Sequence, residues 1–281
     1  MTGLVPASTP DGPPVVCCDL DGVLWRGDEP LPGSADAVAT LREAGLRVGF
    51  LSNNSSQPVT EVAHKLETMG VPVTPGEVLT SATAAAELLG ADLAPGTRVL
   101  VCAGPGVVEE LRAVGLAPVD DPPAEAVVVG FHRSFDFDRL DCASAAIRGG
   151  ARFVATNLDA TYPVPGGVVP GAGALVAAVA TASGRAPEVA GKPEAPTVAL
   201  VRHAWGSRGV VVGDRPSTDG ALAAALGWPF ALVLSGVTVA GGGPGGEDIP
   251  VPAPPFVAAD LAALVPELVT TLRPASQPRP G

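Results

Sequence analysis

The sequence predicts an α/β fold: a parallel sheet with helices on both faces, and a second α/β domain inserted into the first. Two observations predict it. Short, almost continuously apolar runs alternate with stretches of helical spacing along most of the chain. This alternation is typical of parallel strands that are buried on both faces and joined by helices. The middle of the chain has strand and helix patterns of its own, which indicates a separate domain.

Each strand candidate is an apolar run bounded by turn residues or acids. The runs are 15–19, 46–51, 98–102, 126–129, 153–156, 209–212 and 230–234. The stretch 34–44 has helical spacing, with Ser34 as the expected N-cap and Gly45 as the stop. A second helix is expected over 58–69, closed by Gly70.

The expected domains are a core formed by 14–80 and 185–270, and an inserted domain over 81–184. Residues 1–13 and 271–281 are expected to be disordered, and 241–250 to form a surface loop rich in Gly and Pro. The formal net charge of −12 argues against a nucleic-acid partner. No apolar run approaches the roughly 20 residues of a membrane span, and the first residues do not resemble a signal peptide. We therefore expect a cytoplasmic protein without membrane partners.

Two carboxylates, Asp19 and Asp21, follow the first apolar run and are themselves followed by Gly22. Acids two positions apart at a strand end can converge on one divalent cation, which relieves their repulsion. Gly22 lets backbone N–H groups approach a phosphate. The alternative is the polar start of an ordinary loop, where Asp and Gly are both common.

A second acidic pair, Asp214 and Asp219, follows the apolar run 209–212. Asp214 can supply another oxygen ligand to Mg²⁺, and Asp219 a further ligand or a partner for a bound water. The alternative is a helix start carrying acids, which the helix dipole favours.

Two polar segments complete the set. Ser52, Asn53 and Asn54 follow a strand and can bind phosphoryl oxygens, or can simply form a capping turn. Lysine is rare in this chain, with only Lys65 and Lys192. Lys192 can neutralise a nucleophilic carboxylate together with a phosphate. Lys65, in a polar helix, is expected to be an ordinary surface residue.

Together these segments resemble the haloacid dehalogenase superfamily, in its motif order and over about 15–237. The stretches that carry the resemblance are Asp19-Leu20-Asp21-Gly22-Val23, Ser52-Asn53-Asn54-Ser55, Gly191-Lys192-Pro193 and Gly213-Asp214 with Asp219. Further stretches resemble the NagD-like, p-nitrophenylphosphatase-like subfamily IIA with a C2-type cap: Ala155-Thr156-Asn157-Leu158-Asp159 and Pro170-Gly171-Ala172-Gly173. The resemblance implies a Rossmann-like parallel-sheet core with an inserted α/β cap.

The resemblance also implies roles. Asp19 would be the nucleophile and form an aspartyl phosphate, and Asp21 would be the general acid and base. Ser52 would bind phosphoryl oxygens, and Lys192 would orient Asp19 and offset charge. Mg²⁺ would be held by Asp19, the Asp21 carbonyl, Asp214 and, in support, Asp219. The chain would be a phosphoric monoester hydrolase.

The loop 156–162 carries Asn157, Asp159 and the sole tyrosine, Tyr162. We expect it to bind substrate, with a structural turn as an equal alternative. His132 stands where relatives commonly carry Asp, and a polar loop residue is the simpler interpretation. The resemblance also implies a possible homodimer through the cap.

The expected substrate is a small phosphorylated metabolite, with glycerol 3-phosphate as the leading guess because the inserted domain has few aromatic residues for stacking a large ring. Phosphoglycolate, pyridoxal phosphate and nucleoside monophosphates are the other candidates. A dehalogenase is disfavoured because it needs neither Asp21 nor Asp214, whereas a phosphomutase shares the motifs. A non-catalytic phosphate-binding or signalling protein is the alternative from another class.

Overall fold

The computed structural model describes residues 12–164, 167–238 and 246–272, which divide into two compact units. Unit 1 contains the described residues of 52–64 and 79–200. Unit 2 contains those of 12–51, 65–78 and 201–272. Each unit has a parallel sheet with helices, which confirms the predicted class of fold. The predicted division into 14–80, 81–184 and 185–270 stays a prediction.

Unit 2 is built on a parallel sheet in the order β15-β14-β13-β1-β4, with β5, which begins at the last residue of this unit's segment 65–78, at the edge beyond β4. Its strands are β1 (Val15–Cys18), β4 (Arg47–Ser52), β5 (Val78–Thr80), β13 (Gly209–Gly213), β14 (Phe230–Val233) and β15 (Phe256–Ala258). Central strand β1 pairs with β4 on one side and β13 on the other. All four of its residues are buried, as expected for an apolar strand covered on both faces.

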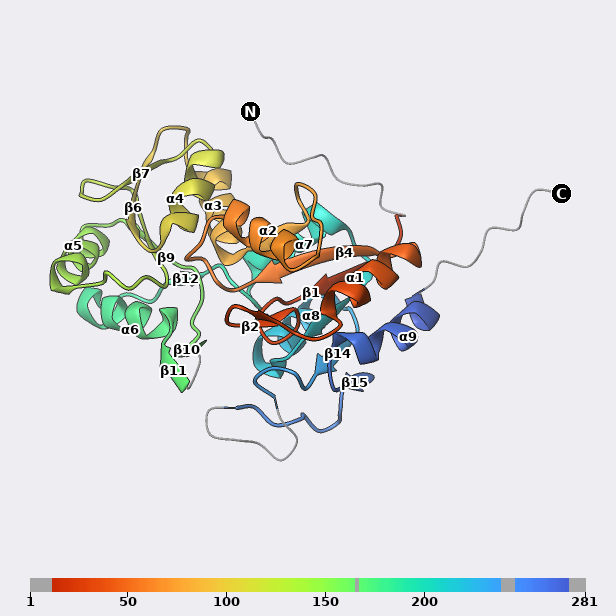
Figure 1. Ribbon diagram of the computed structural model, residues 1–281. Helices are drawn as coiled ribbons and strands as arrows, with labels where there is room; N and C mark the ends of the chain where they lie inside the picture. The colour runs from red at the N-terminus through yellow and green to blue at the C-terminus, as the bar shows by residue number, and fades with distance from the viewer. Residues whose placement is uncertain (1–11, 165–166, 239–245, 273–281) are drawn as a thin grey trace. The chain divides into compact units, whose positions relative to one another are not determined.

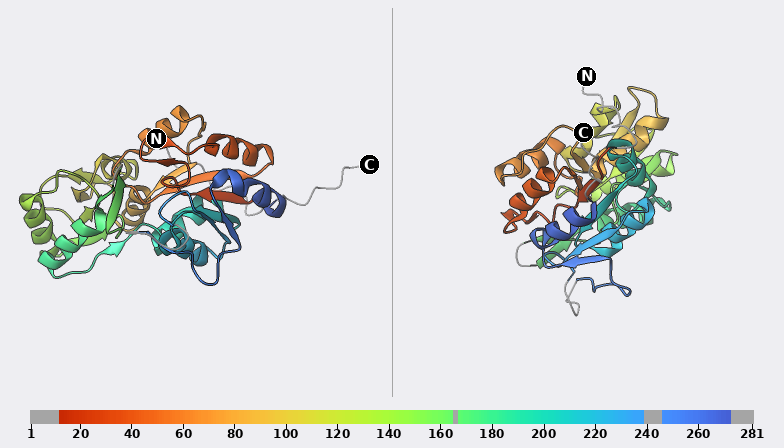
Figure 2. Two further views of the ribbon diagram at one scale, coloured as in Figure 1. Left: turned by 60° about the horizontal axis from the view of Figure 1, so that its bottom comes forward. Right: turned by 90° about the vertical axis from the view of Figure 1, so that its right-hand side faces the viewer.

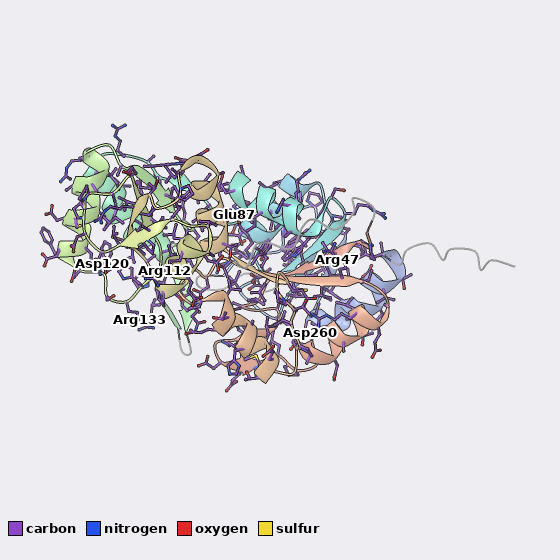
Figure 3. The ribbon with its side chains drawn as sticks, turned by 90° about the horizontal axis from the view of Figure 1, so that it is seen from above. Arg47, Glu87, Arg112, Asp120, Arg133 and Asp260 are labelled. Carbon is purple, nitrogen blue, oxygen red and sulfur yellow. The ribbon has the colours of Figure 1, made fainter. Side chains whose placement is uncertain are left out.

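The helices of unit 2 cover this sheet, and two helices run across the boundary between the units. The elements are the hairpin β2 (Trp25–Arg26) and β3 (Glu29–Pro30), α1 (Ser34–Glu43), α2 (Val59–Thr68), α7 (Ala195–Trp205), the π-helix η1 (Pro216–Gly220), α8 (Ala221–Leu226) and α9 (Leu261–Leu272). Helices α1 and α9 lie side by side in Figures 1 and 2. Asp260, labelled in Figure 3, accepts a hydrogen bond from the Ala263 N–H (2.9 Å) and so caps α9.

Unit 1 has a second parallel sheet, in the order β12-β9-β8-β6-β7. Its elements are α3 (Ser81–Asp92), β6 (Arg98–Cys102), α4 (Pro105–Ala113), β7 (Ala117–Val119), β8 (Ala126–Val129), α5 (Phe137–Arg148), β9 (Arg152–Ala155), the hairpin β10 (Thr161–Val164) and β11 (Gly167–Pro170), α6 (Ala172–Ser183) and β12 (Glu188–Val189). Helices α5 and α6 pack side by side and close a core with β6, β8 and β9 (Figure 1). The Asp136 carboxylate caps α5 by accepting from the Arg139 N–H at 2.9 Å.

The predicted strands and the first two helices agree with the structure to within about two residues. One detail was wrong: the N-cap of α1 is Gly33, and the buried Ser34 hydroxyl instead donates to the Leu24 carbonyl at 3.1 Å. Helix α9 extends to Leu272, so the first two residues of the predicted C-terminal tail are helical. The rest of that tail, residues 1–11 and 241–245 of the predicted loop lie outside the described residues. None of the described helices is long and apolar enough to cross a membrane.

Candidate active site

Three buried carboxylates of unit 2 gather at one edge of its sheet. Asp19 directly follows β1, Asp214 directly follows the neighbouring strand β13, and Asp219 lies in η1. Because adjacent parallel strands end at the same edge, the first two acids are brought together by the sheet itself. One oxygen from each of the three carboxylates lies within 4.8 Å of the others.

Main-chain N–H groups hold these acids in place. The Val237 N–H donates to Asp214 Oδ2 at 2.5 Å, and the Arg215 N–H donates to Asp219 Oδ2 at 3.1 Å. Burial, and after it the negative charge of Asp19, raises the pKa of the Cys18 thiol to about 12. Three buried carboxylates therefore lie close together, and main-chain donors fix two of them.

The cluster fits a hard divalent cation such as Mg²⁺. Carboxylate oxygens are the ligands that Mg²⁺ prefers, and a divalent charge offsets the repulsion of several buried anions. Asp21, also predicted as a ligand, does not contribute its carboxylate to this cluster. The resemblance assigns the main-chain carbonyl of Asp21, and not its carboxylate, as the ligand of Mg²⁺.

Gly22 packs directly against the edge of the sheet that carries the three acids. Its φ is +82°, and a Cβ at this position would lie 2.5 Å from Asp214 Oδ2. The Ser235 hydroxyl donates to the Gly22 carbonyl at 2.6 Å. Only glycine adopts this left-handed conformation readily and also leaves room for the Asp214 carboxylate at this distance.

The Asp21 carboxylate is oriented by the indole of Trp25, whose Nε1–H donates to Asp21 Oδ1 at 3.0 Å. The Lys65 ammonium lies 4.5 Å from the centre of the Trp25 ring and donates to the Gly27 carbonyl at 2.6 Å. The expectation that Lys65 is an ordinary surface residue was wrong, because its charge ties α2 to this hairpin.

The remaining predicted residues come together within unit 1. The buried Ser52 hydroxyl accepts from the Asn54 N–H at 3.0 Å. Lys192 is 6% exposed, and its main-chain N–H donates to Asn53 Oδ1 at 2.8 Å. The Asn54 amide donates to the Tyr162 hydroxyl at 3.4 Å, so the segment after β4 contacts the loop 156–162.

In the predicted cap loop, Asn157 and Asp159 form part of the same network. The Asn157 amide donates to the Asn53 carbonyl at 2.8 Å, and Asn157 Oδ1 accepts from the Asp159 N–H at 3.0 Å. Tyr162 stacks on Phe131 with ring centres 5.2 Å apart. The loop is thus a structured element, and its contact with substrate stays a prediction.

His132 lies apart from these contacts. Its Nδ1 is 3.2 Å from the Ser134 hydroxyl, and its ring meets Phe135 edge-on. Burial lowers the pKa of His132, which favours a neutral ring at pH 7.

Comparisons with known proteins agree with this geometry. Residues 16–117 match the family described as haloacid dehalogenase-like hydrolase, and 189–264 match a second profile of HAD-hydrolase-like proteins. The D-glycerol 3-phosphate phosphatase of Mycobacterium tuberculosis is 41% identical over 251 residues, covering 88% of this chain and 69% of the relative.

The chain belongs to the haloacid dehalogenase-like hydrolases.

Solved structures of this family superpose well on the chain. A glycerol phosphate phosphatase from Mycobacterium tuberculosis in complex with magnesium has a TM-score of 0.81 at 36% identity, covering 95% of this chain and 81% of the other. A p-nitrophenyl phosphatase from Archaeoglobus fulgidus has a TM-score of 0.81 at 30% identity, covering 92% and 100%. The predictions of the family, its fold and a hydrolase are confirmed.

Sequence reasoning missed three residues of this haloacid dehalogenase-like site: Trp25, Ser235 and Val237. Ser235 lies two residues beyond the end of β14, the strand next to β13. A similar strand-end argument therefore applied to Ser235, whose hydroxyl donates to the Gly22 carbonyl. Val237 uses its main-chain N–H, which carries no residue-type signal. Trp25 lay only four residues beyond Asp21, but nothing in the sequence shows where an indole N–H points.

Proposed function

We propose that this hydrolase is a Mg²⁺-dependent phosphatase acting on a small phosphomonoester, with glycerol 3-phosphate as the leading substrate. The observation that carries the proposal is the buried cluster of Asp19, Asp214 and Asp219. The phosphatases among its relatives support the reaction. The Mycobacterium tuberculosis relatives named for glycerol phosphate support the substrate.

In the proposed reaction, a carboxylate oxygen of Asp19 attacks phosphorus while the bond from phosphorus to the ester oxygen breaks. Asp21 gives its proton to the leaving alcohol. Asp21 then takes a proton from water, whose oxygen attacks the aspartyl phosphate at phosphorus, so that phosphate leaves and Asp19 is regenerated. The Trp25 indole keeps the Asp21 carboxyl directed throughout both steps.

Positive charges would offset the negative charges of the nucleophile and the phosphate. Mg²⁺, held by Asp19, Asp214, Asp219 and the Asp21 carbonyl, would let the anionic nucleophile and the anionic phosphate meet. Lys192 would add one positive charge, and the Ser52 hydroxyl would bind a phosphoryl oxygen. Gly22, Asn54, Asn157 and Asp159 are proposed to shape the binding site around the phosphate and the leaving group.

The test is release of inorganic phosphate by the full chain. Glycerol 3-phosphate, phosphoglycolate, pyridoxal phosphate and nucleoside monophosphates are compared with Mg²⁺ and with EDTA. We expect Mg²⁺-dependent turnover, fastest with glycerol 3-phosphate, and no turnover by Asp19→Asn. The exposed Asp141→Asn is the matched control and should retain activity. Absence of Mg²⁺-dependent release from every ester contradicts the proposal.

A signalling protein gives a different result in the same assay, because it accepts phosphate on Asp19 without multiple turnovers. The homodimer implied by the resemblance is also a proposal, and size-exclusion chromatography with light scattering tests it. Fractionation of the native cells tests the proposed cytoplasmic location.

A further inference from the structure

Asn53 forms hydrogen bonds to the main chain of Lys192 through both the oxygen and the nitrogen of its carboxamide. Its Oδ1 accepts from the Lys192 N–H at 2.8 Å, and its Nδ2 donates to the Lys192 carbonyl over a longer 3.4 Å. The two residues are 139 positions apart in the chain, so this pair joins distant segments of unit 1.

Asn53 makes three further hydrogen bonds, through its amide nitrogen and its main-chain carbonyl. Its Nδ2 also donates to Asp159 Oδ2 at 3.2 Å. Its main-chain carbonyl accepts from the Asn157 amide at 2.8 Å and from the Ser81 hydroxyl at 2.6 Å. One residue thus connects the loop after β4 with α3, the loop after β9 and the segment that carries Lys192.

The packing around this contact is tight. A Cβ at Gly191 would lie 2.7 Å from Asn53 Oδ1 and 3.1 Å from the Asn157 Cβ, well inside normal contact distances. The Lys192 peptide can approach the Asn53 amide this closely only because residue 191 has no side chain. Asn157 and Lys192 are both buried, at 5% and 6% exposure.

We propose that Asn53 is a positioning residue that fixes where the Lys192 side chain starts. The sequence suggested a substrate-binding role for Asn53, but its carboxamide oxygen and nitrogen already bond to protein. A lysine side chain has four flexible methylenes, so the placement of its ammonium depends on a fixed main chain. Misplacement of a reacting group by about 1 Å can cost on the order of 100-fold in rate. The inference rests on the proposed function for the role of Lys192, but the contact itself does not.

The contact has a direct spectroscopic test, because the chain has only two lysines. Protein made with isotope-labelled lysine gives two backbone amide signals, from Lys192 and Lys65. In Asn53→Ala, we expect the Lys192 signal to move and its hydrogen exchange to accelerate at least about tenfold, while Lys65 in α2 stays unchanged. Asn54→Ala is the matched control: its amide bonds to Ser56 and Tyr162, so both signals should stay in place.

Kinetics distinguish positioning from substrate contact. We expect Asn53→Ala to lower kcat by about 10- to 100-fold with KM within about twofold. Asn53→Asp keeps the acceptor for the Lys192 N–H but sets a carboxylate beside Asp159. The double variant Asn53→Asp/Asp159→Asn replaces that repulsion with a donor, so its Lys192 amide signal should return toward the wild-type position.

An unchanged Lys192 amide in Asn53→Ala overturns the proposal. A loss carried by KM alone, with kcat intact, also overturns it and returns Asn53 to substrate binding. If the wild type releases no phosphate from any ester, the proposed phosphatase fails, whereas the amide signal still decides whether Asn53 holds Lys192.

Discussion

Gly22 and Asp214 come from segments 192 positions apart, and they lie so close that a Cβ on Gly22 would sit 2.5 Å from Asp214 Oδ2. Gly22 also has a φ of +82°, a conformation that L residues rarely adopt. The residue that begins the turn after Asp21 therefore also limits the space around a proposed Mg²⁺ ligand. Stability and activity are linked at this one position.

The first prediction is that Gly22→Ala lowers both the free energy of unfolding and the catalytic activity. The left-handed backbone costs about 1–2 kcal/mol with a Cβ, and the contact with Asp214 adds to that cost. Displacement of the Asp214 carboxylate should lower kcat at least roughly 100-fold. Chemical denaturation and phosphate release measure the two effects.

Gly45→Ala is the matched control for that variant. Its φ is +80°, but a Cβ there meets nothing within 4 Å. We expect only the backbone cost and normal kcat. Equal losses in the two variants would show that the space beside Asp214 does not matter.

The second prediction concerns Mg²⁺ and stability. Asp19, Asp214 and Asp219 are buried close together, so a cation that binds them should stabilise the folded state. At about 100 times its Kd, Mg²⁺ contributes about 2.7 kcal/mol, which raises Tm by about 5 °C in a chain of this size. Differential scanning calorimetry with EDTA and then with excess Mg²⁺ measures the shift.

Two variants test whether the Mg²⁺ that raises Tm binds the three buried carboxylates. Asp214→Asn removes one negative charge, so the midpoint of the Mg²⁺ titration should rise at least about tenfold. Asp260→Asn alters an acid at the start of α9 and should keep the full shift. The same Mg²⁺ response in both variants would place the cation elsewhere.

Strand ends made much of this site predictable. Asp19 and Asp214 each stand at the end of an apolar run, and parallel pairing of β1 with β13 puts those ends at one edge of a sheet. The predicted strands were accurate because burial on both faces leaves little choice but apolar residues. These features are encoded by residue type and local order alone.

The sequence did not reveal in which direction individual side chains point. The Ser34 hydroxyl turns to a carbonyl ten positions back, and Lys65 reaches across to Trp25. Asn53 uses its amide on a main chain 139 positions away. A residue type states which bonds a side chain can make, but only the fold decides which partner comes within reach.

The third prediction concerns Cys102, a thiol of unit 1. Burial is the main reason that its pKa is raised from an ordinary value of 9.0 to about 11. In the unfolded chain the thiol ionises near its ordinary pKa, whereas in the folded chain it stays protonated. Stability should therefore fall as pH rises from about 9 to about 11, by on the order of 2 kcal/mol.

Denaturation of the wild type and of Cys102→Ala across that range measures the effect. The variant should lose this part of the pH dependence, although its cavity lowers stability at every pH. Cys142→Ala is the comparison variant. Burial also raises the pKa of this half-buried thiol, so the variant should lose some of the slope, but less than Cys102→Ala loses. Identical slopes in all three proteins would mean that Cys102 ionises no differently on folding.

The fourth prediction isolates the indole N–H of Trp25. Trp25→Phe keeps an aromatic ring under the Lys65 ammonium but removes the donor to Asp21 Oδ1. A less well directed Asp21 transfers protons less efficiently in both steps, so we expect kcat to fall about tenfold. The free energy of unfolding should change by only about 1 kcal/mol, the net contribution of one hydrogen bond.

Trp228→Phe is its control because that buried indole also donates a single bond, to the Ser207 carbonyl at 2.9 Å. Both variants should lose similar stability, whereas only Trp25→Phe should lose kcat. Since Asp21 serves in formation and breakdown of the aspartyl phosphate, rapid-quench measurements should find both rates reduced in Trp25→Phe. A variant that slows neither step would show that Asp21 needs no help from the indole, and that Trp25 serves only to pack the hairpin.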